Sequence, residues 1–108
     1  MNEIKPINKV NVGSIFSCSW GYDATNVDFY QVTKLNPASV VVREISKTTV
    51  EDGMMCGKAT AVKDSFIGEP MVKRIRVSPQ YTSFRVTSYS NAYLMADHTK
   101  PQYVSWYH

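Results

Sequence analysis

The sequence predicts an all-β protein, built as a small, strongly bent barrel of the SH3-like type, with an OB-like barrel as the alternative. Roughly seven short runs rich in β-branched and aromatic residues alternate with turn signals along the chain. No long stretch shows the apolar period of an amphipathic helix. With 108 residues, the chain is long enough for one domain with a single core.

The N-terminal residues mix Asn, Lys and isolated apolar side chains, and we expect residues 1–12 to form an arm ahead of a barrel domain at 13–108. The first strand, Ile15–Trp20, alternates apolar and polar residues, which is typical of a half-buried strand. Its apolar face is predicted to hold Phe16, Cys18 and Trp20.

The second strand, Val27–Lys34, is rich in β-branched and aromatic residues but alternates less regularly. Val27 and Phe29 point one way, whereas Tyr30 and Val32 point the other. A switch of this kind predicts a bulge, or a strand bent so that its two ends bury different faces.

The third strand, Ser39–Ile45, follows an Asn-Pro turn, and its three consecutive valines indicate burial on both faces. With its two predecessors it forms a β-meander. The polar run after it either extends the strand or begins a loop, and Asp52-Gly53 signals a turn. One further strand is predicted at 58–63, which leaves 46–70 as the least determined region of the chain.

Two strands, Met71–Val77 and Thr82–Ser88, flank a Ser-Pro turn in the C-terminal third. Ala92–Met95 and Tyr103–Tyr107 are predicted to form the two arms of a closing hairpin. As an alternative, Ser88–Ala92 forms a single helical turn capped by its serine.

The basic residues are concentrated in the same third of the chain. The formal net charge is +3, and residues 71–108 hold five of the twelve Lys and Arg beside a single acidic residue, Asp97. If the strands at 71–77 and 82–88 pair antiparallel, three arginines project from one sheet face. These are Arg74, Arg76 and Arg85.

Those arginines predict a face that binds DNA or RNA. Guanidinium groups bind phosphates bidentately and anchor nucleic acid electrostatically. Tyrosines stand nearby in the sequence and can stack on bases, namely Tyr81, Tyr89 and Tyr93. The alternative is a solvated basic face that keeps a β protein soluble, which the mild net charge favours.

Seven Tyr, four Phe and two Trp exceed the needs of one small core, so some of them are expected at a partner-binding or dimer surface. The candidates lie in the first loop and at the C-terminus: Trp20, Tyr22 and Asn26, and Tyr103, Trp106 and Tyr107. The alternative is that Trp20 belongs to the core, Tyr22 covers the barrel end and the C-terminal aromatics close the barrel bottom.

Metal binding and catalysis have no motif here. Cys18, Cys56, His98 and His108 lack zinc-ligand spacing, and the cysteines are expected to be reduced. Cys18 is expected to pack as an inert thiol. No carboxylate pair, nucleophile elbow or phosphate-binding glycine loop occurs. We therefore expect no metal, no cofactor and no enzymatic activity.

The run CSWGYDATNVDFYQV and the later run SYSNAYLMADHTKPQYVSWY resemble a group of small uncharacterised proteins encoded by bacteriophages, prophages and other mobile elements. The shared signature is S-W-G-Y-x-x-T-N-V-D-F-Y-Q-V, and about two thirds of the chain takes part in the resemblance. The resemblance implies a phage or prophage origin and a cytoplasmic life in a bacterium. It implies no activity and no functional residues.

The first functional hypothesis is a small phage or mobile-element binding module that acts through protein–protein interaction with a host or phage protein. Interference with a host system would fit its size. The alternative is a nucleic-acid-binding β-barrel, and the third is a homodimeric structural part. No apolar run approaches the roughly 20 residues of a transmembrane helix. The N-terminus lacks a signal-peptide core, so we expect no membrane association and a cytoplasmic location.

Overall fold

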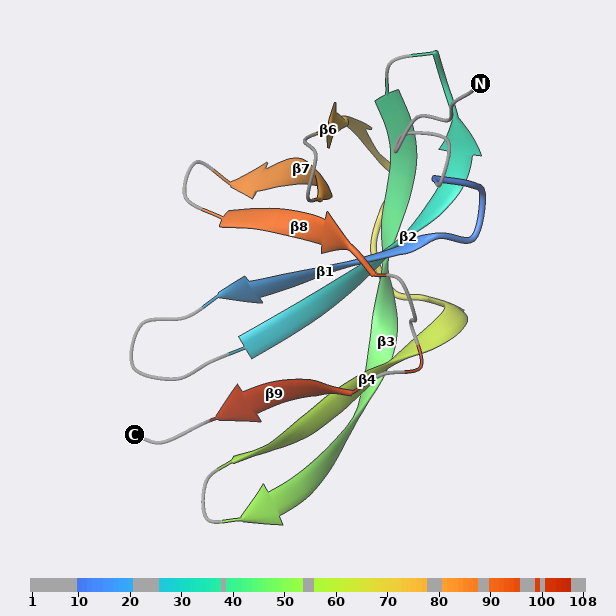
Figure 1. Ribbon diagram of the computed structural model, residues 1–108. Coiled ribbons are helices and arrows are strands. Elements are labelled where there is room, and N and C mark those ends of the chain that lie inside the picture. The colour runs from blue at the N-terminus through green and yellow to red at the C-terminus, as the bar shows by residue number, and fades with distance from the viewer. Residues whose placement is uncertain are drawn as a thin grey trace, which may run out of the picture.

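The computed structural model describes residues 10–20, 26–37, 39–53, 56–77, 81–87, 90–95, 99 and 101–105 (Figure 1). These residues form nine strands and no helix, which confirms the all-β prediction. The strands are β1 (Ile15–Trp20), β2 (Asn26–Leu35), β3 (Ser39–Gly53), β4 (Cys56–Phe66), β5 (Met71–Arg74), β6 (Arg76–Val77), β7 (Thr82–Thr87), β8 (Ser90–Leu94) and β9 (Gln102–Ser105).

Antiparallel pairings join the strands into one strongly bent sheet, whose barrel is closed by the chain itself between β5 and β6. β1 pairs with β2, β2 with β3 and β3 with β5. After Ile75 the chain continues as β6, which pairs with β7, and β8 joins β7 back to β1. This is the small, strongly bent barrel that the sequence predicts. Most of its pairs join chain neighbours, as in an SH3-like meander and unlike the Greek key of an OB-like barrel.

The expected single strand at 71–77 is two strands. Ile75 interrupts it, and the halves pair with different neighbours, β3 on one side and β7 on the other. The closing hairpin is wrong as well, because β8 pairs with β1 and β7 whereas β9 pairs with β4. The helical turn is wrong for residues 90–92, which lie in β8. β7 and β8 form the hairpin instead.

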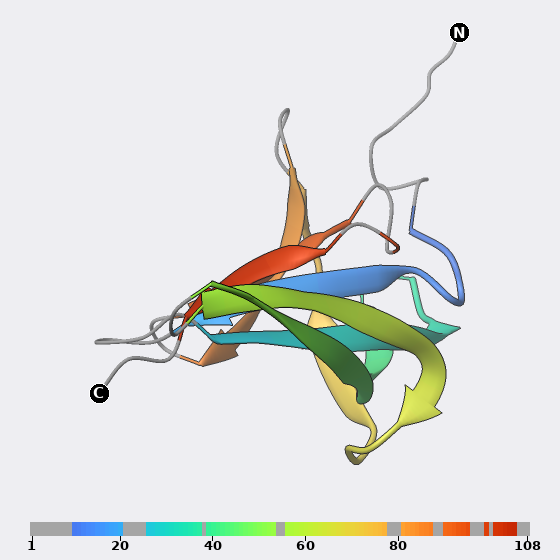
Figure 2. The same ribbon diagram turned by 90° about the horizontal axis from the view of Figure 1, so that it is seen from below.

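β3 and β4 extend beyond the barrel as a long hairpin, which helps to give the molecule its extents of 49 × 28 × 27 Å. Figure 2 shows that β4, in yellow-green, curves strongly along its length. The sequence underestimates this region, because it predicts one short strand at 58–63. Residues 47–51 are all exposed, so their sequence carries no apolar alternation although the backbone pairs with β4.

Two buried clusters lie on opposite faces of the sheet, where the sequence predicts one core. The first, inside the barrel, comprises Val10, Phe16, Cys18, Tyr30, Val32, Val40, Val42, Phe84 and Ala92. The second comprises Ile15, Val27, Phe29, Ile45, Ala59, Ala61 and Val104. β2 supplies both clusters, which confirms that its two ends bury different faces. A register shift between β2 and β3 follows at Val32–Lys34.

The residues before β1 belong to the barrel from Val10 onward, whereas the rest of the expected N-terminal arm lies outside the described residues. Val10 is 6% exposed and packs in the first cluster. The amide of Gly13 donates to the carbonyl oxygen of Val32 at 2.8 Å, so a turn ties this segment to β2.

Polar contacts fix the bend of β4. The buried amide of Gln31 donates to Asp64 Oδ1 at 2.7 Å and accepts the Asp64 amide N–H at 2.7 Å. Asp64 has φ of 68°, an uncommon conformation that an aspartate tolerates in such a corner. Arg43 stacks over Phe66 and donates to the carbonyl of Gly68 at 2.8 Å. These contacts hold β4 against β2 and β3.

Candidate functional site

The outer face of β6, β7 and β8 gathers polar and aromatic side chains. Arg76 lies opposite Ser83, and Ser83 lies opposite Tyr93. Arg85 lies opposite Asn91 on the same face. Directly opposed residues in an antiparallel pair are side-chain neighbours. The intervening residues of β7 and β8 point into the first cluster. The side chains on the outer face are therefore not part of that core.

A shallow pocket of about 200 Å³ opens on this face. It is lined by Arg76, Val77, Tyr81, Ser83, Asn91 and Tyr93. The rings of Tyr81 and Tyr93 meet edge to face, with centroids 5.2 Å apart and planes at 85°. Tyr81 is 51% exposed and Tyr93 is 43% exposed, so both rings present surface to a ligand.

Three polar groups in the pocket have no hydrogen-bond or ionic partner within the described part of the chain. They are the guanidinium of Arg76, the hydroxyl of Ser83 and the carboxamide of Asn91. Ser83 is only 4% exposed. Buried hydroxyls are nearly always hydrogen-bonded in native proteins, so this one needs an explanation. A ligand seated in the pocket can supply the missing partners.

The structure brings together four of the residues that the sequence assigns to a nucleic-acid face: Arg76, Arg85, Tyr81 and Tyr93. Arg74 lies apart on β5, where it is exposed and pairs with Ser39 of β3. Tyr89 lies outside the described residues. Sequence reasoning missed Ser83 and Asn91, because their position beside the arginines depends on the register of β6, β7 and β8.

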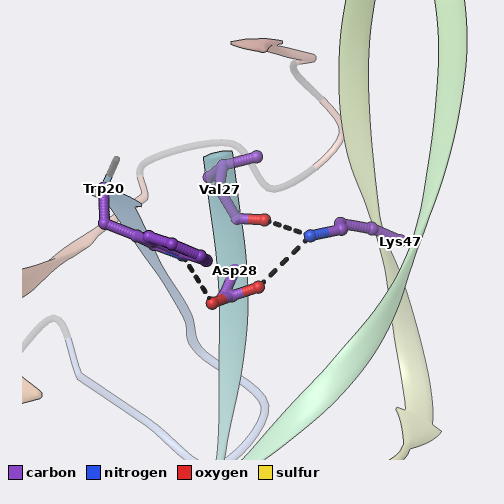
Figure 3. A network of polar contacts seen from close by, with 4 residues as sticks. All are labelled: Trp20, Val27, Asp28 and Lys47. Carbon is purple, nitrogen blue, oxygen red and sulfur yellow. Dashed lines mark hydrogen bonds and ion pairs between the residues drawn. The ribbon is translucent and has the colours of Figure 1, made fainter. Parts of the chain in front are cut away.

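A second polar cluster surrounds Asp28, where β1 ends and β2 begins (Figure 3). The indole N–H of Trp20 donates to Asp28 Oδ2 at 2.8 Å. The ammonium of Lys47 lies 3.2 Å from Asp28 Oδ1 and donates to the carbonyl of Val27 at 2.5 Å. Each oxygen of the carboxylate therefore has a partner, and the cluster ties β3 to the first hairpin.

Trp20 is 49% exposed, so the alternative that places it in the core is wrong. It follows the alternation of Phe16 and Cys18, but it stands at the end of the strand, where the side chain is solvent-exposed and bonded to Asp28. Asn26 is opposite it in the register. Tyr103 lies in β9 opposite Lys58. Tyr22, Trp106 and Tyr107 lie outside the described residues.

The buried ionisable groups pack rather than face a ligand. Cys18 is 1% exposed, and desolvation raises the pKa of its thiol, which disfavours the reactive thiolate. Desolvation also raises the pKa of Tyr30 and of Glu44, and the negative charge of Asp28 adds to both shifts. Lys47 partly offsets the shift of Glu44.

Within the described ranges, no group of three His, Cys, Asp or Glu side chains is placed to hold a metal ion. His98 and His108 lie outside those ranges. Nor do the described residues include a helix of the length and apolar character needed to cross a membrane. No family model, curated protein or solved structure matches the chain. Inference about function therefore rests on the geometry of the molecule itself.

Proposed function

We propose that this protein is a binding module, with no catalytic role, that holds single-stranded nucleic acid on the outer face of β6, β7 and β8. The observation that carries the proposal is the pocket in which Arg76, which has no partner among the described residues, lies beside two half-exposed tyrosines. Arg76 and Arg85 supply bidentate donors for phosphates. Stacking on an exposed aromatic ring contributes about 1–3 kcal/mol per base.

A single strand fits this face better than a duplex. Stacking on Tyr81 or Tyr93 requires a base that is free of its own neighbours, which a duplex does not offer. The pocket, at about 200 Å³, is smaller than the roughly 300–1,000 Å³ of sites that enclose a whole small-molecule ligand. It therefore suits one ring-sized group of a longer chain that continues across the surface.

The electrostatic contribution to binding is modest, because the net charge is only +3 and the contacting arginines are few. Two neutralised phosphates on a single strand, one for each arginine, give a logarithmic salt slope of about −1.4. We expect the affinity to fall roughly 7-fold between about 50 mM and about 200 mM salt.

Fluorescence anisotropy with labelled single-stranded DNA, single-stranded RNA and duplex DNA at these two salt concentrations tests the proposal. The double variant Arg76→Gln/Arg85→Gln should lose most of the binding. Its matched control is Lys34→Gln/Lys63→Gln, which removes the same charge from exposed positions outside the pocket-forming strands. Absence of binding by the wild type at the lower salt, or equal losses in both double variants, would overturn the proposal.

The second candidate function is recognition of a host or phage protein through Trp20, with interference in a host system as its consequence. The observation that favours it is a half-exposed indole whose N–H is held by Asp28. Tryptophan is enriched among residues that dominate protein interfaces. Capture of one bacterial protein by the wild type but not by Trp20→Ala would support this candidate. Equal capture by both would exclude Trp20 as the contact.

A further inference from the structure

We propose that the pocket between β6, β7 and β8 reads a single base of the bound strand and prefers adenine. The inference deepens the proposed function and rests on it. A face that used only charge and stacking would need arginines and tyrosines but no enclosed polar groups. This pocket adds two polar groups, the buried Ser83 and the partly buried Asn91.

Ser83 is the residue that most clearly indicates a ligand-binding pocket. Its side chain lines the pocket, is only 4% exposed and has no hydrogen-bond partner within the described residues. Leaving a buried hydroxyl without a hydrogen bond is unfavourable, because its lost contact with water is not replaced. The hydroxyl both donates and accepts, so it can bind either kind of group on the edge of a base.

Asn91 supplies the selectivity. Its carboxamide presents one acceptor oxygen beside two donor hydrogens and has no partner among the described residues. That pattern matches the adjacent amino group and ring nitrogen of adenine, and asparagine is the residue that typically contacts this edge. Uracil and thymine lack the amino group, whereas adenine presents an amino group beside a ring acceptor on two of its edges and cytosine on only one.

The strand register places these groups within reach of one base. Tyr93 lies directly opposite Ser83, and Asn91 precedes Tyr93 by two residues on the same face of β8. Same-face neighbours along a strand are about 7 Å apart, and opposed neighbours about 5 Å apart. A base that stacks on Tyr93 therefore has its edge near Asn91 and Ser83.

The arginines flank this base-reading set. Arg76 is across Ser83 from Tyr93, two strand spacings or about 10 Å away. Arg85 lies opposite Asn91. Both can contact the strand's phosphates while the base occupies the pocket. The arginines are thus expected to set affinity for every sequence, whereas Asn91 sets the preference among bases.

Anisotropy with four labelled strands tests this assignment. The reference is an all-thymine strand of roughly 12 nucleotides, and the others replace one central thymine by adenine, cytosine or guanine. The adenine strand should bind at least about 5-fold more tightly than the reference, the lower end of what one bidentate contact discriminates. Asn91→Ala should remove this preference, so that the four strands bind within about 2-fold of one another.

Two further variants separate base reading from general binding. Arg76→Gln should weaken all four strands by the same factor and keep the adenine preference. Asn91→Asp, which nearly preserves the side chain's shape, should lose the adenine preference because a carboxylate cannot donate to the ring nitrogen of the base. Thermal unfolding of each variant confirms that the barrel is intact.

The outcomes distinguish the two proposals. Equal binding of all four strands by the wild type would overturn the base-reading pocket and leave the single-strand function standing. Absence of binding to any strand at about 50 mM salt would overturn both. An adenine preference that survives both Asn91 variants would also overturn the assignment of Asn91.

Discussion

The two polar clusters on the surface differ in whether their groups have partners. Around Asp28, the carboxylate accepts from Trp20 and from Lys47, and Lys47 also bonds to a backbone carbonyl. In the pocket of β6, β7 and β8, the polar groups of Arg76, Ser83 and Asn91 have no partner within the described residues. The bonded groups around Asp28 stabilise the fold, whereas the polar groups in the pocket are available to bind a ligand.

This difference has a measurable consequence. Polar groups that are bonded to one another contribute to the free energy of unfolding, and removing one leaves the others unsatisfied. Polar groups without partners contribute little to stability or lower it. Variants around Asp28 should therefore change stability and spare binding, whereas variants in the pocket should do the reverse.

The largest expected effect is on the fold. Asp28→Ala removes the acceptor of both Trp20 and Lys47, so we expect the free energy of unfolding to fall by about 1–2 kcal/mol. Denaturant titration followed by tryptophan fluorescence and circular dichroism measures it. Glu69→Ala, which removes an exposed carboxylate without a partner in the described residues, is the control and should stay within about 0.5 kcal/mol. Equal losses would contradict the structural role of Asp28.

The next effect is on binding alone. Arg76→Gln should raise the Kd for a single strand about 5-fold, because one charge-assisted phosphate contact is lost. Its free energy of unfolding should stay within about 0.5 kcal/mol of the wild type, since the guanidinium bonds to no described residue. A loss of stability comparable to that of Asp28→Ala would remove the contrast between the clusters.

Ser83→Ala provides a further test of the difference between the groups around Asp28 and those in the pocket. Removing an unsatisfied buried hydroxyl should leave stability unchanged or raise it by up to about 1 kcal/mol. The same variant should bind the adenine-containing strand about 3-fold more weakly. Denaturant titration and anisotropy on one preparation give both values. A clear destabilisation would mean that the hydroxyl serves the fold.

The smallest effect concerns pH and Glu44, whose neighbours are Asp28, Tyr30 and Lys47. Burial raises the pKa of Glu44, so the folded state holds this proton more tightly than the unfolded state. Stability should therefore decrease as pH rises from the usual glutamate value of 4.5 through the raised pKa. Glu44→Gln should flatten that decrease, which unfolding midpoints measured across the range will report. An unchanged profile would contradict the burial of this carboxyl.

The sequence predicts the parts of the fold that local alternation determines. The switch from Val27 and Phe29 to Tyr30 and Val32 predicts that β2 buries both faces, and the two clusters confirm it. The second half of β3 carries no such signal because residues 47–51 are all exposed. The partner of β9 depends on the curvature of β4, which no local pattern encodes.

Only some residues of the candidate site can likewise be predicted from the sequence. Charge and residue type alone indicate Arg76, Arg85, Tyr81 and Tyr93. Ser83 and Asn91 look like ordinary outward-facing polar residues until the register places them opposite Tyr93 and Arg85. Their lack of partners is a property of the packed structure, which the sequence does not display.

The most direct test is a titration of nitrogen-15-labelled protein with the adenine-containing strand, followed by NMR. The account predicts that the amides of Arg76, Ser83, Asn91 and Tyr93 shift, whereas the indole N–H of Trp20, which is bonded to Asp28, keeps its resonance position. Shifts confined to Trp20 and its neighbours, with β6, β7 and β8 unchanged, would contradict it.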